Sequence, residues 1–217
     1  ILSILDAVHN AGGRNITLIS PYLGYSRQDS AISQNSSLGI GILARLLEVS
    51  RINNLITVDL HSSETIKYFP FRVLNIKAFE ILSYYKEKLV EDRVIVVPDK
   101  GGAKRFGQDN IVTMKKIRST NQITIVLDSD VRGKKCLLVD DIVDSGNTMR
   151  AAIKTLTNGG AEDIKLYATH LLSTKSSIPN LITTDSIDYT GDRCFEIISI
   201  APIIASKIMQ FRSCIYE

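Results

Sequence analysis

The stretch CLLVDDIVDSGNTMRAAIKTLTNGGA, residues 136–161, decides the fold of this chain. Its apolar start, Cys136 to Val139, predicts a buried strand, and the apolar spacing from Met149 to Leu156 predicts a helix. The Gly-Gly pair at 159–160 ends that helix. A strand, a short loop and a helix start therefore follow one another directly. The N–H groups and partial positive charge of a helix start suit a phosphate dianion.

The loop itself, from Asp144 to Thr148, contains groups that can bind a phosphate. Ser145 and Thr148 can add hydroxyl donors, and Gly146 lets the backbone approach a ligand closely. The segment is not a Walker A motif, because no Gly-Lys-Ser/Thr follows the glycine. An ordinary capped helix start is the alternative explanation, since Asp and Ser are favoured at such positions everywhere.

Two adjacent carboxylates, Asp140 and Asp141, stand between the strand and the loop. In contact with a phosphate they would repel it. We therefore expect them a few ångströms away, as acceptors for sugar hydroxyls or as holders of a metal ion.

Length and composition exclude several classes of protein. The 217 residues suffice for one large α/β domain or two small ones. A net charge of +3 is too small to favour nucleic acid or an anionic membrane as partner. No apolar run approaches the roughly 20 residues of a membrane span, and no signal peptide is visible. The cysteines, Cys136, Cys194 and Cys214, are far apart and odd in number, which favours reduced thiols in the cytoplasm.

Apolar, β-branched runs alternate with helical patterns along the chain. We expect strands at 16–20, 55–60, 94–97, 123–127, 136–139, 164–170 and 197–200, and helices at 1–11, 38–49, 78–89, 149–156 and 202–211. This alternation predicts an α/β fold with doubly wound parallel sheets, and the number of strands suggests two such units. The expected units are residues 1–75 with a returning helix at 201–217, and residues 76–200. Because Ile1 already lies in the first helical pattern, we expect the chain to be a fragment.

A glycine pattern at 39–44 fits a dinucleotide fingerprint, but the polar segment before it does not read as the strand that such a site needs. A helix start is the better interpretation.

Further candidate residues follow other strands. The loop PYLGYSRQD ends in Arg27, Gln28 and Asp29, which could hold the phosphates and base of a nucleotide, although a solvated loop arginine is the plain alternative. Asp59 and His61 end the second strand, where alternation would place them on one face.

Asp99 follows another strand, as VPDKGG. Together with Asp59 and His61 it could bind Mg²⁺, partly through waters; a structural role for His61 remains the alternative. His9 and His170 show no zinc spacing.

A basic segment, Lys115-Lys116-Ile117-Arg118, precedes the polar residues 119–122. It predicts a mobile hairpin or flap whose cations could neutralise charge in phosphoryl transfer. A solvated charge run is the alternative.

Five strings, PYLGYSRQD, ITVDLHSSE, VVPDKGGAKR, LLVDDIVDSGNT and SIAPIIASKI, run from one end of the chain to the other. In this order they resemble the ribose-phosphate pyrophosphokinases, the phosphoribosyl-pyrophosphate synthetase family. A plain phosphoribosyltransferase would share only the phosphate loop.

The resemblance implies a fold, a reaction and a set of site residues. It implies two phosphoribosyltransferase-like units and an enzyme that transfers diphosphate from ATP to the 1-hydroxyl of ribose 5-phosphate. It also implies Mg²⁺ as cofactor and a homo-oligomer, either dimer or hexamer, with no nucleic acid or membrane as partner. The implied residues are Arg27, Gln28 and Asp29 for ATP; His61, Asp99 and Asp59 for the metal; Lys116 and Arg118 for catalysis; and Arg118, Asp140, Asp141, Asp144, Ser145, Gly146, Asn147 and Thr148 for ribose 5-phosphate.

The chain departs from the family pattern in several places. Ser145 stands where Thr is commoner, and Asn147 where Gly is common. The family has roughly seventy further residues before Ile1, including a hairpin that grips adenine. The segment 30–37 lacks the usual basic residues, which predicts weak or altered activation by phosphate. A non-catalytic or regulatory member that binds sugar phosphate, and a base-using phosphoribosyltransferase, remain the competing interpretations, and Lys115 could replace Lys116 as the flap lysine.

Overall fold

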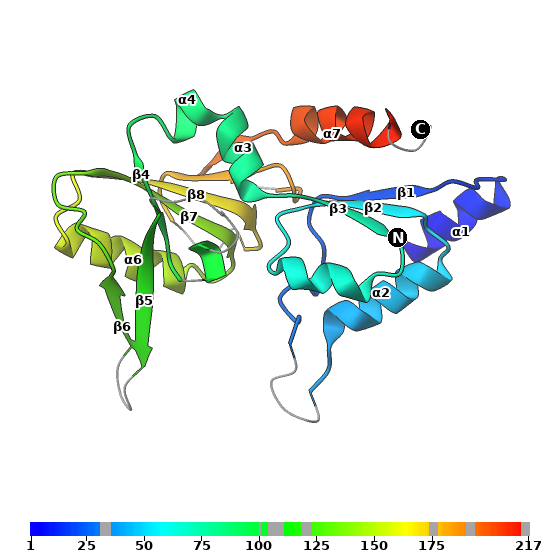
Figure 1. Cartoon of the computed structure of the whole chain (residues 1–217), viewed down its shortest axis with the longest axis horizontal. Helices are drawn as coiled ribbons and strands as arrows, with labels where there is room; N and C mark the ends of the chain where they lie inside the picture. Colours follow the sequence, from blue (N-terminus) through cyan, green and yellow to red (C-terminus); the bar gives the residue numbers. More distant parts are fainter. Residues whose placement is uncertain are drawn as a thin grey trace. The chain divides into compact units, whose positions relative to one another are not determined.

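The computed structural model describes residues 1–30, 36–99, 101–103, 111–118, 123–173, 178–189 and 194–213, with the backbone alone at 116–118, 123–125 and 211–213. Contacts divide the chain into two compact units, residues 1–77 and 78–217 (Figure 1). The division falls close to the boundary expected at residue 75. It groups the closing helix with the second unit, whereas the sequence suggests a return to the first.

The first unit is built on a three-stranded parallel sheet. Its order is β1-β2-β3, formed by Thr17–Ser20, Asn54–Val58 and Arg72–Ile76. The helices are α1 (Leu2–Asn10) and α2 (Gly39–Val49), with a 3₁₀ helix η1 (Ser63–Tyr68) after β2. Both α-helices pack on the same side of the sheet (Figure 1).

The core of the first unit follows from helical spacing. In α2, Ile40, Ala44 and Leu47 are buried at intervals of four and three residues, as on one face of an α-helix. They form one cluster with Leu5 of α1 and Leu55 of β2. β2 lies between β1 and β3 in the sheet and is buried along its whole length.

The second unit contains a seven-stranded sheet of order β10-β9-β8-β7-β4-β5-β6. The strands are β4 (Val94–Val97), β5 (Val112–Arg118), β6 (Ile123–Leu127), β7 (Lys135–Val143), β8 (Asp163–Leu171), β9 (Leu181–Thr184) and β10 (Glu196–Ile198). The helices with assigned bounds are α3 (Ala78–Tyr84), α4 (Lys86–Leu89), α6 (Asn147–Asn158) and α7 (Ala201–Ser213). All strand pairs are parallel except β5 with β6.

Helix α6 covers one face of this sheet (Figure 1). Its residues Met149, Ala152 and Leu156 are buried against Cys136 and Leu138 of β7. Burying a large apolar side chain is worth about 1.5–3 kcal/mol relative to leaving it exposed. This packing fixes the start of α6 at the carboxyl end of β7.

Helix α7 is tied to the second unit by polar contacts. Lys207 forms a 2.5 Å ion pair with Glu80 of α3. The hydroxyl of Tyr85 donates to the carbonyl of Ser199, just before α7, at 2.7 Å. These contacts agree with the grouping of α7 in the second unit.

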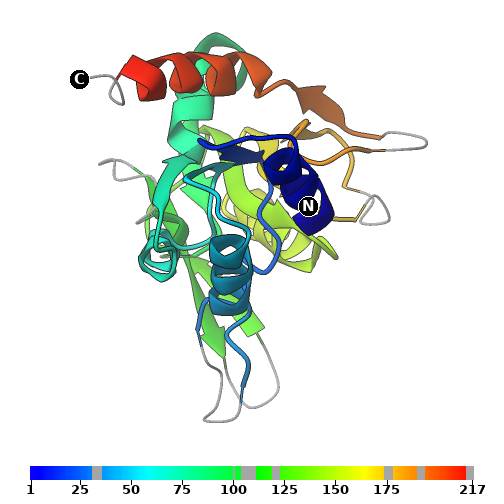
Figure 2. The same ribbon diagram turned by 90° about the vertical axis from the view of Figure 1, so that its right-hand side faces the viewer.

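The β5–β6 pair differs from the parallel arrangement expected throughout. β5 pairs with β4 only through Val112 and Thr113, because β4 ends at Val97. Beyond that point, β5 is joined to β6 as a two-stranded antiparallel ribbon that projects from its unit in both views (Figures 1 and 2). The basic segment expected to form a flap therefore belongs to a strand.

Among the described helices, none combines the length and the apolar character that a membrane crossing needs.

Candidate functional site

The loop between β7 and α6 is shaped by Gly146. This residue is the N-cap of α6 and has a φ of 77°, in the left-handed region. A Cβ at this position would lie 2.8 Å from Cδ1 of Ile178 and 2.9 Å from Nη1 of Arg150. Glycine is therefore required by both the backbone conformation and the lack of space.

The amino end of α6 is well suited to an anion. Gly146 has no side chain with which to cap the helix, and the first turn of α6 carries no acidic residue. The positive end of the helix dipole is thus not offset by a carboxylate in that turn. Ser145 and Thr148 are exposed beside it. The turn and helix start expected from the sequence are present, and the binding of a phosphate by this loop stays a prediction.

The two adjacent acids lie within β7 rather than after it. Asp140 is paired in register with Ala168 of β8, and the strand continues to Val143. Successive residues of a strand face opposite sides, and the burial differs accordingly: Asp140 is half-buried, whereas Asp141 is 5% exposed. The carboxylate of Asp140 also accepts a 3.0 Å bond from the N–H of Asp141. The two acids therefore cannot have the same contacts with a ligand.

Arg150 contacts the loop, and this role was not predicted from the sequence. Its Nη2 donates to the carbonyl oxygen of Ser145 at 2.5 Å and to Oδ1 of Asn147 at 3.0 Å. The spacing of three residues from Asn147 on a helix start was a signal in the sequence. Its contact with Ser145 depends on the turn at Gly146.

Buried hydrogen bonds brace the end of β8, the strand beside β7. His170 is 1% exposed, and its Nδ1 lies 2.8 Å from Oγ of Ser186. The hydroxyl of Thr184 donates to the carbonyl of Thr169 at 2.7 Å, and the N–H of Leu171 donates to the hydroxyl of Tyr189 at 3.0 Å. Burial raises the pKa of Tyr189 above its ordinary value, so the phenol stays protonated. The end of β8, next to β7, is therefore held by several buried hydrogen bonds.

In the first unit, the segment after β1 carries the predicted nucleotide residues. Arg27 and Gln28 are exposed, and Asp29 is half-buried. The N–H of Gln28 donates to the carbonyl of Tyr25 at 2.9 Å, and the carbonyl of Gln28 accepts from the N–H of Ile40 at 3.3 Å.

A Cβ on Gly39 would collide with Oε1 of Gln28. The first glycine of the apparent dinucleotide pattern therefore serves the packing of α2 on this segment.

The expected alternation of Asp59 and His61 does not hold in the structure. β2 ends at Val58, and Asp59 has a φ of 45°, which is not extended backbone. Asp59 is 4% exposed and its N–H donates to the carbonyl of Ile76 at 2.8 Å, while His61 is half-buried.

Asp99 follows β4 in the second unit and is exposed; its Oδ1 accepts from the N–H of Gly102 at 2.8 Å. In the described part of the chain, no three His, Cys, Asp or Glu side chains gather as a metal site. Asp59 and His61 belong to one unit and Asp99 to the other, so the predicted metal set stays a prediction.

The two predicted catalytic residues lie in the projecting ribbon. Lys116 and Arg118 are in β5, paired in register with Ile125 and Ile123 of β6. Their side chains lie outside the described part of the structure, as do residues 119–122 entirely. Lys115 is exposed. The choice between Lys115 and Lys116 remains a prediction.

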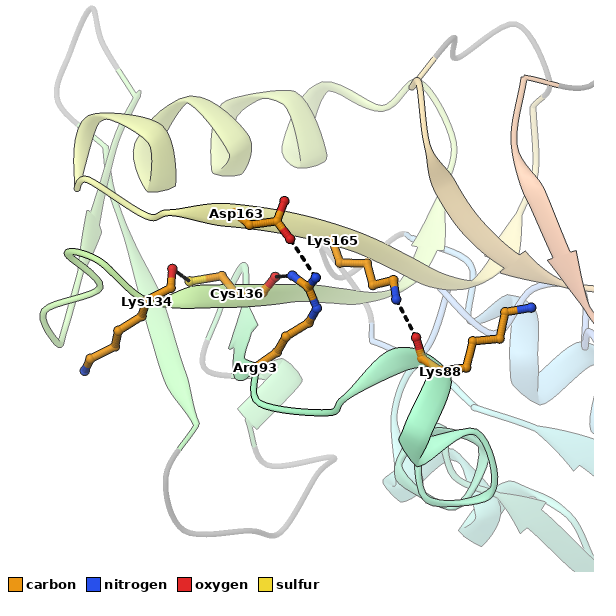
Figure 3. A network of polar contacts seen from close by, with 6 residues as sticks. All are labelled: Lys88, Arg93, Lys134, Cys136, Asp163 and Lys165. Carbon is orange, nitrogen blue, oxygen red and sulfur yellow. Dashed lines mark hydrogen bonds and ion pairs between the residues drawn. The ribbon is translucent and has the colours of Figure 1, made fainter.

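A hollow lies at the amino-terminal edge of the sheet of the second unit, opposite the edge from which the β7–α6 loop leaves. It has a volume of about 640 Å³ and is lined by Arg93, Asp163, Lys165 and Glu196, among others. Arg93 forms a 2.6 Å ion pair with Asp163, and Lys165 donates to the carbonyl of Lys88 (Figure 3). Lys88 in turn pairs with Glu196. The charged side chains around the hollow are thus held by ion pairs and by a hydrogen bond within the protein, which indicates a structural role for them.

Comparison with known proteins identifies the family. Residues 1–50 match the N-terminal domain of ribose phosphate pyrophosphokinase, and residues 102–207 match the phosphoribosyl transferase domain. A ribose-phosphate pyrophosphokinase of Gloeobacter violaceus is 30% identical over 96% of this chain and 69% of its own length. Ribose-phosphate pyrophosphokinase 1 of Streptococcus pyogenes is 31% identical over 97% of this chain and 73% of its own length.

The chain belongs to the ribose-phosphate pyrophosphokinase family. The phosphoribosylpyrophosphate synthetase of Mycobacterium smegmatis has the same fold, with a TM-score of 0.82 and 28% identity over 98% of this chain and 76% of that one. The family resemblance and the α/β fold expected from the sequence are thereby confirmed.

Proposed function

We propose that this chain transfers the terminal diphosphate of ATP to the 1-hydroxyl of ribose 5-phosphate, giving 5-phosphoribosyl 1-diphosphate and AMP for nucleotide biosynthesis. The observation that carries the proposal is the glycine-dependent loop at the start of α6, found in a member of this family. A ribose-phosphate diphosphokinase needs such a loop for the 5-phosphate of its sugar substrate.

In the second unit, the loop residues Asp144, Ser145, Gly146, Asn147 and Thr148 hold the 5-phosphate. Backbone N–H groups at the start of α6 and the hydroxyls of Ser145 and Thr148 are its donors. The half-buried carboxylate of Asp140 accepts bonds from the ribose hydroxyls. The buried Asp141 supports the same strand end from the opposite face.

In the first unit, Arg27, Gln28 and Asp29 contact ATP. The exposed guanidinium of Arg27 suits the phosphates, because Arg pairs with phosphate oxygens through two parallel bonds. The segment is anchored on α2 through the backbone of Gln28, which keeps its position defined.

Mg²⁺ is the cofactor that this reaction calls for, and the predicted ligands are His61, Asp99 and Asp59. Their carboxylate oxygens and imidazole match the donors that Mg²⁺ accepts directly or through waters. The exposed carboxylate of Asp99 is the most accessible of the three. When bound, Mg²⁺ neutralises charge on the transferred diphosphate.

Lys116 and Arg118 are the catalytic residues of the proposal, and Arg118 also contacts ribose 5-phosphate. The 1-hydroxyl of the ribose attacks the β-phosphorus of ATP in line, its proton is released, and AMP leaves. No covalent nucleophile is needed, because positioning and charge stabilisation do most of the work in phosphoryl transfer. The projecting β5–β6 ribbon would bring these cations to the diphosphate.

Homo-oligomerisation as a dimer or hexamer and a cytoplasmic location complete the proposal. The buried Cys136 and the exposed Cys194, both free thiols, agree with a reducing compartment.

The decisive assay incubates the purified chain with ATP, Mg²⁺ and ribose 5-phosphate and measures AMP and 5-phosphoribosyl 1-diphosphate. We expect equal amounts of the two products, and a fall in kcat of about 100-fold or more in the Lys116→Ala variant. Lys115→Ala is the matched control and should retain most of the activity.

Three outcomes would change the assignment. Loss of activity in Lys115→Ala instead would move the catalytic role to Lys115. Binding of ribose 5-phosphate without AMP formation would identify a non-catalytic member. Turnover of 5-phosphoribosyl 1-diphosphate with a nucleobase, without ATP, would identify a phosphoribosyltransferase.

A further inference from the structure

The phosphate loop of this chain contains a cation that none of the assigned residues supplies. Arg150 lies in the first turn of α6, four residues after the N-cap Gly146. We infer that Arg150 is an additional binding residue for the 5-phosphate of the sugar substrate, held at the loop by Asn147. The inference rests on the proposed function of this loop.

The contacts of Arg150 place its charge at the loop. One nitrogen, Nη2, bonds both the carbonyl of Ser145 and Oδ1 of Asn147. The other terminal nitrogen, Nη1, lies 2.9 Å from where a Cβ of Gly146 would be. Although the residue is exposed, its guanidinium is therefore folded back over the loop rather than extended into solvent.

The negative charge of nearby carboxylates gives a reason for a cation at the loop. Asp140, Asp141 and Asp144 are all within this segment, and each opposes the approach of a phosphate dianion. A cation in the first turn of a helix is disfavoured by the helix dipole unless an anion binds there. A phosphate at the start of α6 would therefore be attracted by Arg150 and would relieve its unfavourable position.

Asn147 links this cation to a departure of the sequence from its family. Glycine is common at that position, and glycine could not accept the bond from Arg150. Asn147 and Arg150 thus form a pair, in which the amide oxygen orients the guanidinium. Arg, unlike Lys, can contact loop oxygens and a phosphate through one planar group, because it has five N–H donors.

The test measures binding of ribose 5-phosphate to the whole chain by calorimetry, without ATP. Arg150→Ala is expected to weaken binding about tenfold, the effect of losing one hydrogen bond from a charged group. Arg150→Lys should recover part of that loss. Lys154→Ala is the matched control, because Lys154 is exposed one helical turn further along α6; its affinity should stay within about twofold of the wild type.

Two further measurements distinguish phosphate binding by Arg150 from a purely structural role in the loop. Ribose without its phosphate should bind equally to the wild type and Arg150→Ala, and the KM for ATP should be unchanged. Asn147→Gly should weaken binding of ribose 5-phosphate in the wild type and have no effect in Arg150→Ala, since the amide side chain acts only through Arg150 and glycine keeps the backbone N–H that faces the phosphate. Equal losses for ribose and ribose 5-phosphate would overturn the inference in favour of bracing.

The failures can be told apart. Arg150→Ala with unchanged affinity, or Lys154→Ala with the same loss, would overturn the inference while leaving the proposed function intact. A wild-type chain that binds no ribose 5-phosphate would overturn both. Should Arg150→Ala not fold, as judged by its circular dichroism, Arg150→Gln removes the charge but keeps an amide donor, and the same expectations apply to it.

Discussion

Gly146 shows how a single residue controls the phosphate loop, because two separate effects exclude a side chain there. The first is the left-handed backbone, with φ of 77°, and the second is the closeness of Ile178 and Arg150. Gly133 separates the two effects. It has a φ of 66°, but a Cβ added there would meet no atom within 4 Å. Both glycines thus have a left-handed backbone, but only Gly146 lacks room for a side chain.

The first prediction compares Gly146→Ala with Gly133→Ala. The left-handed conformation alone should cost about 1–2 kcal/mol of unfolding free energy in each variant. Gly146→Ala should cost about 1–3 kcal/mol more, through crowding against Ile178 and displacement of Arg150. Urea denaturation measures both, and calorimetry should show weaker ribose 5-phosphate binding in Gly146→Ala only. Equal losses of stability and affinity in the two variants would refute the crowding argument.

The strand, the turn and the helix start around the proposed phosphate loop were predictable because strand pattern, turn glycine and helix start are local signals. The contacts of Arg150 were only partly predictable, because its bond to Asn147 follows from helical spacing, whereas its bond to Ser145 exists only once the chain has turned at Gly146. Asp59 was misplaced for a similar reason: its predicted facing assumed extended backbone, whereas its φ is 45°. Side-chain direction at a strand end depends on how the chain leaves the strand.

At the scale of elements, β7, α6 and β8 were found because their apolar spacing is strong. β7 continues through Asp140 and Asp141, although Asp is poorly suited to strands, because the ladder with β8 extends to Val143. β3 and β9 were missed because polar residues interrupt their apolar runs, namely Arg72 and Asn75 in β3 and Thr183 and Thr184 in β9. For the β5–β6 ribbon, the sequence predicted a hairpin or flap and the strand at 123–127, but not the length of β5 or its register with β6, because these depend on pairing that sequence spacing does not reveal.

The Arg93–Asp163 pair ties the segment before β4 to the first residue of β8 (Figure 3). The hydrogen bond from Arg93 holds the pKa of Asp163 below its ordinary value, and the charge of the guanidinium acts in the same direction. A depressed carboxyl pKa gives stability that is present above the unfolded pKa of about 3.9 and is lost as the pH falls through the folded pKa. Since the Asp163 side chain is 52% exposed, solvent screening keeps the effect small.

The second prediction concerns this pair. Asp163→Asn should lower the free energy of unfolding by about 0.5–1 kcal/mol at pH 7, and the difference from the wild type should shrink at pH values below about 4. Urea denaturation from pH 7 down to pH 3 measures this trend. Glu196→Gln is the control, because the Lys88–Glu196 pair is exposed on both sides and should contribute almost nothing. A difference that stays constant with pH would show that the ionised carboxylate is not its source.

At the scale of the whole molecule, the chain consists of two units with separate cores. One cluster around Leu55 belongs to residues 1–77, and another around Leu138 belongs to residues 78–217. The family matches divide in the same way, with one at 1–50 and the other at 102–207. The proposed ATP segment lies in the first unit, and the proposed ribose phosphate loop lies in the second. Each substrate should therefore change the hydrogen exchange of a different unit.

The third prediction concerns the rate of amide hydrogen exchange in each unit when each substrate is added. Ribose 5-phosphate alone should slow exchange of amides at 144–150, because it bonds the N–H groups at the start of α6, and should leave residues 22–29 unchanged. ATP with Mg²⁺ should slow exchange at 22–29. Mass spectrometry of peptides from both units measures this, with ribose as the control that lacks the phosphate. Protection of 22–29 by ribose 5-phosphate alone would show either that the first unit contributes to the sugar phosphate site or that the two units are energetically coupled. If ribose protected 144–150 as strongly as ribose 5-phosphate does, the loop would not be the binding site of the phosphate.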